Sequence, residues 1–287
     1  MNMNAVSAPL ISVIIPVRNA AGNIRACIQS LACQTFKDFE VLFMDGASTD
    51  DTVEIIKSCI PETGKFIVSS STDLGIYDAM NKGIKKSTGR WFYFFGSDDQ
   101  LAGSNVLSGV AKHLGEDDEI VYGDIILSPG GQQEKGEWNN KRMLHMCINH
   151  QRIFYKAKLF HKYGVFDLRY PVNADYGLNI SLFSNPLVRK KHITLPIAFY
   201  NSGVFSFNKV DENFWDDFQQ VIAKKFSPYL SRKEIYGRLA FYCWYHLNKK
   251  NYYKAFRLFC WIYIHTLSFG FLKHSLSQFR KSFGNHV

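Results

Sequence analysis

The segment Ile11–Val17 reads ISVIIPV, an unbroken apolar run rich in β-branched residues. A strand with helices packed on both faces of its sheet has this kind of sequence, because neither of its faces meets water. The next segment, Asn23–Gln34, carries Ile24, Ile28 and Leu31 at helical spacing. Together the two segments predict the strand–helix start of an α/β fold.

The alternation of strands and helices continues along the first half of the chain. Further strands are predicted at Glu40–Met44, Phe66–Ser69, Trp91–Phe95 and Ile120–Tyr122, and further helices at Thr52–Cys59, Ile76–Lys86 and Val106–Leu114. Such alternation predicts βαβ units and a mainly parallel sheet flanked by helices. The stretch Pro129–Gly136 then predicts a turn or loop, because it is rich in Gly and Gln.

Beyond this loop the pattern is mixed. Short strands are predicted near Arg152–Tyr155 and Ile193–Tyr200, and helices near Tyr176–Phe183 and Glu212–Lys225. We therefore predict one α/β domain over residues 1–230, with residues from about 9 to 125 forming its nucleotide-binding half and residues from about 126 to 230 its acceptor half.

Composition excludes several classes of protein. Of 287 residues, 46% are hydrophobic, which is typical of a globular chain and not of a disordered or collagen-like one. Six cysteines without a CxxC pair or zinc spacing predict reduced thiols in a cytosolic protein. The short apolar run Leu10–Ile15 does not resemble a cleaved signal peptide, and Leu258–Leu272 is shorter and more polar than the ~20 residues of a membrane-spanning helix.

The basic excess lies at the carboxyl end. The chain has a formal charge of +9, yet residues 220–287 hold 12 Lys and Arg and a single acid, Glu234, together with 17 of the 44 aromatic residues. Residues 231–287 are predicted to form a basic, aromatic helical tail, with two helical stretches around the polar break Asn248–Asn251. Three interpretations stay open: a nucleic-acid surface, a surface for an anionic membrane, or a hairpin packed on the body. We favour a hairpin that offers a membrane surface, and no nucleic acid as partner, because no nucleic-acid motif accompanies the charge.

Acidic residues follow three of the predicted strands. Asp45 ends the second strand, Asp73 follows the third, and Asp98 and Asp99 follow the fourth. Ligands of open α/β sheets bind beyond the carboxyl ends of the strands, where a divalent cation can bridge carboxylates to phosphate oxygens. The chain has no GxGxxG after its first strand and no GxxxxGK[ST], which argues against a dinucleotide cofactor and a P-loop ATPase. The pattern favours a nucleotide diphosphate held through a metal ion.

At these positions the chain resembles the family 2 glycosyltransferases. The resemblance rests on Pro16-Val17-Arg18-Asn19, Asp45–Thr52 (DGASTDDT), Asp73–Gly83 (DLGIYDAMNKG), Gly96–Asp99 (GSDD), His150-Gln151 and Asn173–Tyr176 (NADY). It implies a GT-A fold with a C-terminal helical extension and an inverting, metal-dependent transfer of a sugar from a nucleotide-sugar. The bacterial cell-envelope polysaccharide branch fits best, because of the run GIYDAMNKG.

The resemblance also implies roles for single residues. Asp45 would contact the base and Asp73 the base or ribose. The family's Asp-x-Asp metal motif has Gly96 at its first position here, so Asp98 and Asp99 remain to hold Mn²⁺ or Mg²⁺. Asp175 would be the catalytic base.

The chemistry of sugar transfer requires a base and a metal ion independently of the resemblance. Attack by an acceptor hydroxyl needs a base, and a departing nucleoside diphosphate needs a Lewis acid. Because attack comes from the side opposite the leaving group, the base must lie across the sugar from the metal.

Further residues complete the predicted site. The predicted nucleotide-binding residues are Pro16, Arg18, Asn19, Asp45, Asp73, Asn81, Lys82, Ser97 and Asp98, and the predicted acceptor residues are His150, Gln151 and Asp124. Each of the acids has an alternative structural interpretation, because Asp is common in turns and at helix N-termini.

The predicted function is transfer of a sugar from a nucleotide-sugar to a lipid-linked glycan, on the cytoplasmic face of the cell membrane. Two alternatives stay open. A nucleotidyltransferase would carry a Gly-rich, basic loop after its first strand, and residues 16–22 supply one Gly and one Arg. A non-catalytic protein that binds a nucleotide-sugar or a membrane is the other alternative.

Overall fold

The computed structural model describes residues 8–201, 211–266 and 277, without the side chains of residues 219–224, 265 and 266. The chain forms two compact units. The first contains residues 1–137 and 147–211, and the second contains residues 138–146 and 212–287. The second unit thus begins before residue 231, where the sequence predicted the tail. The predicted tail also includes residues 267–276 and 278–287, which lie outside the described part.

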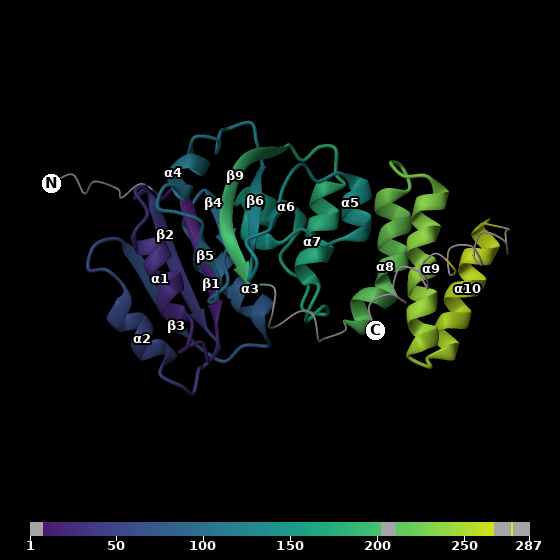
Figure 1. The fold of residues 1–287 in the computed structure, drawn as a ribbon, viewed down its shortest axis with the longest axis horizontal. Helices are drawn as coiled ribbons and strands as arrows, with labels where there is room; N and C mark the ends of the chain where they lie inside the picture. The colour runs from purple at the N-terminus through teal and green to yellow at the C-terminus, as the bar shows by residue number, and fades with distance from the viewer. Residues whose placement is uncertain (1–7, 202–210, 267–276, 278–287) are drawn as a thin grey trace. The chain divides into compact units, whose positions relative to one another are not determined.

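Four parallel strands form the amino-terminal half of the sheet (Figure 1). They are β1 (Ile11–Val17), β2 (Phe39–Asp45), β3 (Lys65–Ser70) and β4 (Trp91–Phe94), in the order β3-β2-β1-β4. Every residue of β1, β2 and β4 is buried, as the apolar sequences of β1 and β4 predict. Strand β2 also buries two acids, Glu40 and Asp45. Strand β3 is partly exposed because it lies at the edge of the sheet. All four strands end on the same side, which brings the loops after them together.

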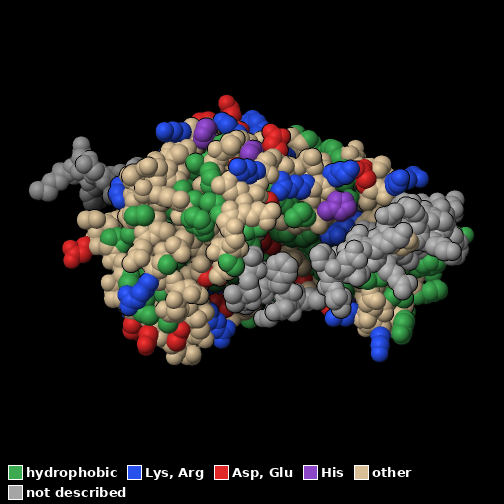
Figure 2. All heavy atoms as spheres, in the orientation of Figure 1, with side chains coloured by type: hydrophobic (Ala, Val, Ile, Leu, Met, Phe, Trp, Pro, Cys, Tyr) green, Lys and Arg blue, Asp and Glu red, His purple; other side chains and the backbone are tan. Residues whose placement is uncertain are grey.

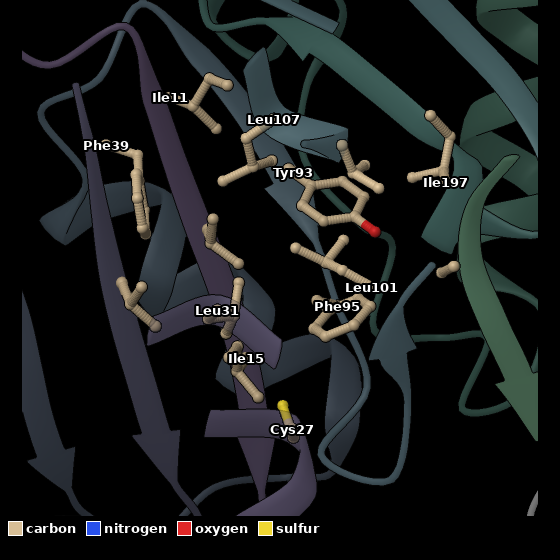
Figure 3. Packing of buried hydrophobic residues seen from close by; sticks show 14 of the residues in the cluster. Ile11, Ile15, Cys27, Leu31, Phe39, Tyr93, Phe95, Leu101, Leu107 and Ile197 are labelled. Carbon is tan, nitrogen blue, oxygen red and sulfur yellow. The ribbon is translucent and has the colours of Figure 1, made fainter. Parts of the chain in front are cut away.

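Helices pack on the sheet, and the first three of them connect these strands. They are α1 (Ile24–Ala32), α2 (Thr52–Cys59), α3 (Ile76–Lys86) and α4 (Val106–Ala111). The buried face of α1, including Cys27 and Leu31, packs in one core with Ile15 of β1 and Phe95 after β4 (Figure 3). The helices at 52–59 and 76–86 begin and end where the sequence predicted them.

The rest of the sheet mixes strand directions. It contains β8 (Ile153–Lys156), β6 (Ile120–Ser128), β9 (Lys190–Asn201) and β5 (Gln100–Leu101), in that order after β4. Strand β8 is antiparallel to β4 and β6, β9 is parallel to β6, and β5 is antiparallel to β9. The segment 129–136, predicted as a turn or loop, also contains a short strand, β7 (Gln133–Glu134), which pairs with β6.

Short helices in this half position residues of the predicted site. They are η1 (His150–Arg152), α6 (Lys158–Tyr163) and α7 (Ala174–Phe183). The sequence did not predict η1 or α6, because segments this short carry little periodicity. Helix α7 places Asp175 in its first turn.

The second unit is helical. It contains α5 (Asn140–His145), α8 (Glu212–Phe226), α9 (Arg232–Asn248) and α10 (Tyr252–Thr266). Ser231 and Glu234 form a capping box that starts α9, and the break between α9 and α10 falls where the sequence placed it. None of the helices in the described residues has the length and hydropathy needed to cross a membrane.

Candidate functional site

A cavity of about 490 Å³ opens at the carboxyl ends of β1 and β4. Six of the predicted nucleotide-binding residues line it: Pro16, Arg18, Asn19, Asp73, Ser97 and Asp98. They come from the loops after β1, β3 and β4, which the parallel sheet brings to one edge. The loops after these three strands thus share one cavity, whereas Asp45, at the end of β2, does not line it.

The loop after β1 is fixed to the loop after β2. Asn19 has a φ of 49°, a left-handed conformation that Asn tolerates better than most residues. Its backbone N–H donates to Ser48 Oγ at 2.8 Å, and its Oδ1 accepts from the Thr49 N–H at 2.9 Å. Arg18, next to it, is exposed and lines the cavity. The hydrogen bonds of Asn19 thus fix the backbone next to Arg18, whose side chain lines the cavity.

Asp73 lies against the end of the neighbouring strand. A Cβ atom added at Gly46 would come within 2.3 Å of Asp73 Oδ2, so Gly46 makes room for this carboxylate. Asp73 Oδ1 accepts from the Gly75 N–H at 2.9 Å, which orders the turn into α3. Gly75 itself has a φ of 118°, a conformation that favours glycine.

A second cavity, of about 200 Å³, adjoins the first. Asp98, Asp99, His150, Gln151 and Asp175 line it, which brings together the predicted metal ligands, catalytic base and two of the predicted acceptor residues. Asp98 lines both cavities. A ligand that fills the first cavity as far as Asp98 therefore reaches the space in front of Asp175.

The two adjacent acids are electrostatically strained. Burial and the neighbouring charge of Asp98 raise the pKa of Asp99 from 3.8 to about 6. Asp99 is held by the N–H groups of Gly96 and Asn201, each at 3.2 Å, and by the side chain of Gln151. Two crowded carboxylates of this kind fit a divalent cation, which would relieve their repulsion. Among the described residues no group of three or more His, Cys, Asp and Glu could hold a metal, so further ligands would have to come from a bound phosphate or water.

Gly96 lies close to the carboxylates of Asp98 and Asp99. A Cβ atom there would come within 2.3 Å of Asp99 Oδ2 and 3.0 Å of Asp98 Oδ1. The Asp99 carboxylate thus occupies the place that a side chain at residue 96 would take. Glycine at residue 96, where the family's motif has its first Asp, thus leaves room for the Asp99 carboxylate as it lies here.

Asp175 is surrounded by groups from distant parts of the chain. Its Oδ1 accepts from the Tyr77 hydroxyl at 2.8 Å and from the Tyr176 N–H at 2.8 Å. Its Oδ2 lies 3.2 Å from His150 Nδ1 and 3.8 Å from Cys147 Sγ. The Asp175 side chain is buried, yet it lines the second cavity.

Three predicted nucleotide-binding residues do not line these two cavities. Asp45 is 2% exposed, and Ser48 Oγ and Ser70 Oγ each donate to its carboxylate at 2.5 Å. Asn81 makes two hydrogen bonds to the Phe166 backbone. Lys82 pairs with Asp78 at 3.1 Å and also donates to the Thr72 carbonyl. Their hydrogen bonds hold loops and helices in place, so their roles in binding stay predictions.

Asp124, the third predicted acceptor residue, lies in a buried charge network. His192 Nε2 lies 2.8 Å from Asp124 Oδ1, and the fully buried Arg152 lies 3.6 Å from the same oxygen. Arg152 also pairs with Glu134 of β7 at 2.7 Å. Asp124 does not line either of the two cavities, because this network turns its carboxylate toward β7 and β9.

Sequence reasoning missed Tyr77 and Cys147, which line the second cavity. Tyr77 lies within the run GIYDAMNKG that carried the family resemblance, so a signal was present. Cys147 gave no signal, because a single Cys outside a motif has no distinctive spacing.

Comparisons with known proteins agree with this geometry. The family model described as glycosyl transferase family 2 matches residues 12–178. A PGL/p-HBAD biosynthesis glycosyltransferase from Mycobacterium tuberculosis is 40% identical over 213 residues, which cover 72% of this chain and 83% of the relative. An uncharacterized glycosyltransferase from Rickettsia prowazekii is 28% identical over 191 residues, covering 61% of this chain and 59% of the relative.

Solved structures share the fold. TarS from S. aureus, in complex with UDP-GlcNAc, aligns with a TM-score of 0.65 at 19% identity and covers 83% of this chain and 73% of its own. In a longer TarS structure the alignment spans 43% of that chain. The mannosyltransferase PcManGT from Pyrobaculum calidifontis, in complex with GDP-Man and Mn²⁺, aligns with a TM-score of 0.55 at 14% identity and covers 98% of this chain and 77% of its own. From the family match, the 40% identical relative and the shared GT-A fold, we conclude that this chain belongs to glycosyl transferase family 2.

Proposed function

We propose that this glycosyltransferase moves a sugar, with inversion, from a nucleotide-sugar to a lipid-linked glycan in bacterial surface polysaccharide synthesis. One observation carries the proposal: Asp98 lines two adjoining cavities, of which one also holds Arg18 and Asp73 and the other Asp175. A donor in the first cavity would have its sugar at the junction. An acceptor in the second cavity would approach that sugar beside a carboxylate.

The first cavity suits a nucleoside diphosphate. Its volume of about 490 Å³ lies in the range of small-molecule sites. Arg18 offers a guanidinium to phosphate oxygens, and Asp73 offers an acceptor for ribose or base. Asp98 and Asp99 would hold Mn²⁺ or Mg²⁺. When bound, such a cation would offset the charge that develops on the leaving diphosphate.

Asp175 would take the proton of the acceptor hydroxyl. A carboxylate serves as a general base when it is ionised and within reach of the attacking group. Asp175 comes from the second half of the chain and Asp98 from the first, so the base and the leaving diphosphate would flank the sugar from two sides. That arrangement supports attack opposite the leaving group and hence inversion.

The test replaces Asp175 with Asn, which keeps the shape of the side chain and removes the base. Donor affinity, measured by calorimetry with UDP-GlcNAc and GDP-Man in the presence of Mn²⁺, should stay within about twofold. Transfer to polyprenyl-linked oligosaccharide should fall by about 10²–10⁴, the usual contribution of a general base. Asp167→Asn is the matched control, because Asp167 is a partly exposed acid outside both cavities that pairs with Arg169. Near-normal transfer by the Asp175 variant would remove the base from the proposal.

We also propose that the second unit binds an anionic membrane surface. Helix α10 exposes Tyr253 by 71% and Phe256 by 66%, and Lys249 and Lys250 lie exposed just before it. Figure 2 shows hydrophobic and basic side chains exposed near one another on the helices of the second unit. Aromatic side chains at the interface and basic side chains on headgroups are the usual means of peripheral membrane binding. Such a surface would bring the enzyme to a lipid-linked acceptor.

Vesicle sedimentation separates the two contributions. Binding to phosphatidylglycerol vesicles should weaken in the double variant Lys249→Gln/Lys250→Gln, and this loss should match the effect of high salt. The variant Tyr253→Ser/Phe256→Ser should weaken the binding that remains at high salt. Equal binding to anionic and neutral vesicles by the wild type would contradict the membrane proposal.

A further inference from the structure

The hydroxyl of Tyr77 touches two hydrogen-bond acceptors at once. Its oxygen lies 2.8 Å from Asp175 Oδ1 and 2.8 Å from the carbonyl oxygen of Val172. Both distances are those of well-formed hydrogen bonds between oxygens. The contacts join α3 to the segment that begins α7, so they bridge residues that are far apart in the sequence.

Tyr77 cannot donate a full hydrogen bond to both oxygens at once. A phenol has one hydrogen to donate, and a backbone carbonyl only accepts. An ionised carboxylate also only accepts, so with Asp175 ionised the Tyr77 hydrogen serves one oxygen or is shared. A protonated Asp175 changes this: its own O–H can donate to the Tyr77 oxygen, and Tyr77 can then donate to Val172. The observed geometry therefore fits both protonation states of the carboxyl group.

The surroundings hold Tyr77 in this place. The side chain is 6% exposed, and its ring packs on Phe166 with centroids 5.4 Å apart. Burial and the negative charge of Asp175 raise the pKa of the Tyr77 hydroxyl well above its usual value, so it stays a donor.

Other titratable groups also face Asp175. His150 and Cys147 contact its Oδ2, and Tyr155 of β8 interacts with its charge. Asp98 and Asp99 line the same cavity. Of these groups, Tyr77 is the one whose hydroxyl contacts Oδ1 and a second acceptor.

We propose that Tyr77 is a positioning residue that keeps Asp175 hydrogen-bonded both before and after this carboxylate receives a proton. Before transfer, Tyr77 donates to the ionised carboxylate. During transfer the O–H bond of the acceptor hydroxyl breaks and an O–H bond forms on Asp175. Afterwards the new carboxyl O–H donates to Tyr77, which turns its own hydrogen to the Val172 carbonyl. The inference rests on the proposed role of Asp175, and no electron transfer or further reactant is needed.

The variant Tyr77→Phe keeps the ring and removes the hydroxyl. Because the ionised carboxylate loses a charge-assisted donor, the acidic limb of the pH–rate profile should move to higher pH by about one unit. At high pH, where Asp175 is ionised in both proteins, kcat should fall by less than about tenfold. Tyr155→Phe is the matched control: its buried hydroxyl donates to Asn179 Oδ1, on the same helix as Asp175, at 2.8 Å. That variant should leave the limb in place.

Two further measurements test whether the shift in the pH–rate profile comes from the contact between Tyr77 and Asp175. The shift should persist in a His150→Asn background, which removes the imidazole that contacts Asp175 Oδ2. Difference infrared spectroscopy can follow the carboxyl band that disappears in Asp175→Asn, and this band should titrate at higher pH in Tyr77→Phe. An unshifted band and an unshifted limb would overturn the role of Tyr77. Normal transfer by Asp175→Asn would instead refute the proposed function, while the infrared titration would still report on the Tyr77 contact.

Discussion

Replacing Asp99 with Asn is expected to stabilise the metal-free protein, although it removes a carboxylate from the proposed metal site. The pKa of Asp99 in the folded protein, about 6, lies above the ordinary value of 3.8. The folded state therefore binds this proton more tightly than the unfolded state. Asp99 is best tolerated below pH 4, and its cost to stability grows as the pH rises through 6.

The size of the effect follows from the same values. The gap between 3.8 and about 6 corresponds to about 3 kcal/mol of lost stability at pH 8. Asn keeps one oxygen acceptor for the Asn201 N–H, but its amide nitrogen cannot accept from the Gly96 N–H. The loss of that hydrogen bond costs about 1 kcal/mol. We therefore expect a net gain of about 2 kcal/mol at pH 8.

Urea unfolding of EDTA-treated protein at several pH values measures this gain. The variant should exceed the wild type at pH 8, and the difference should disappear as the pH falls toward 4. Adding Mn²⁺ should reverse the order, because a ligand that binds only the folded wild type stabilises it by mass action. The variant Asp167→Asn, which changes a partly exposed acid outside the cavities, serves as the control. A variant that is less stable than the wild type at pH 8 without metal would refute the reasoning.

Three other substitutions test separate parts of the site. Gly96→Asp restores the family's motif, yet it should weaken Mn²⁺ binding in calorimetry, because its Cβ would displace the Asp99 carboxylate. Arg18→Gln should raise the Kd for a nucleotide-sugar by about tenfold through loss of a charge-assisted contact, with little effect on the Kd for the free nucleoside. Asn81→Ala should lower stability by about 1–3 kcal/mol in urea unfolding, because it leaves the Phe166 backbone groups unpaired.

The sequence predicted most of the elements that build the site. Buried parallel strands such as Ile11–Val17 have continuous apolar sequences, so their positions and the convergence of the loops after them could be inferred. The pairing of Asp98 with Asp175 across one cavity came from the family resemblance. The GT-A fold that this resemblance implied is confirmed by the structural neighbours.

The sequence could not predict contacts that only the folded chain creates. The hydrogen bonds of Asn81 to the backbone of Phe166, which is distant in sequence, are one such contact. The charge network that joins Asp124 to Arg152 is another, because Arg152 also pairs with Glu134 of β7. In the sequence, Tyr77 looks like one more residue on the buried face of α3. Its hydroxyl finds Asp175 as a partner only because the fold places α7 beside it.

A donor screen tests the central claim most directly. The wild type, supplied with polyprenyl-linked oligosaccharide and with UDP-, dTDP- and GDP-sugars in turn, is assayed for nucleoside diphosphate release with and without Mn²⁺ or Mg²⁺. The two-cavity account predicts that one nucleotide class is consumed, that the metal is required, and that Asp175→Asn abolishes release while still binding the donor. Release of pyrophosphate, or no binding of any nucleotide-sugar with either metal, would contradict it.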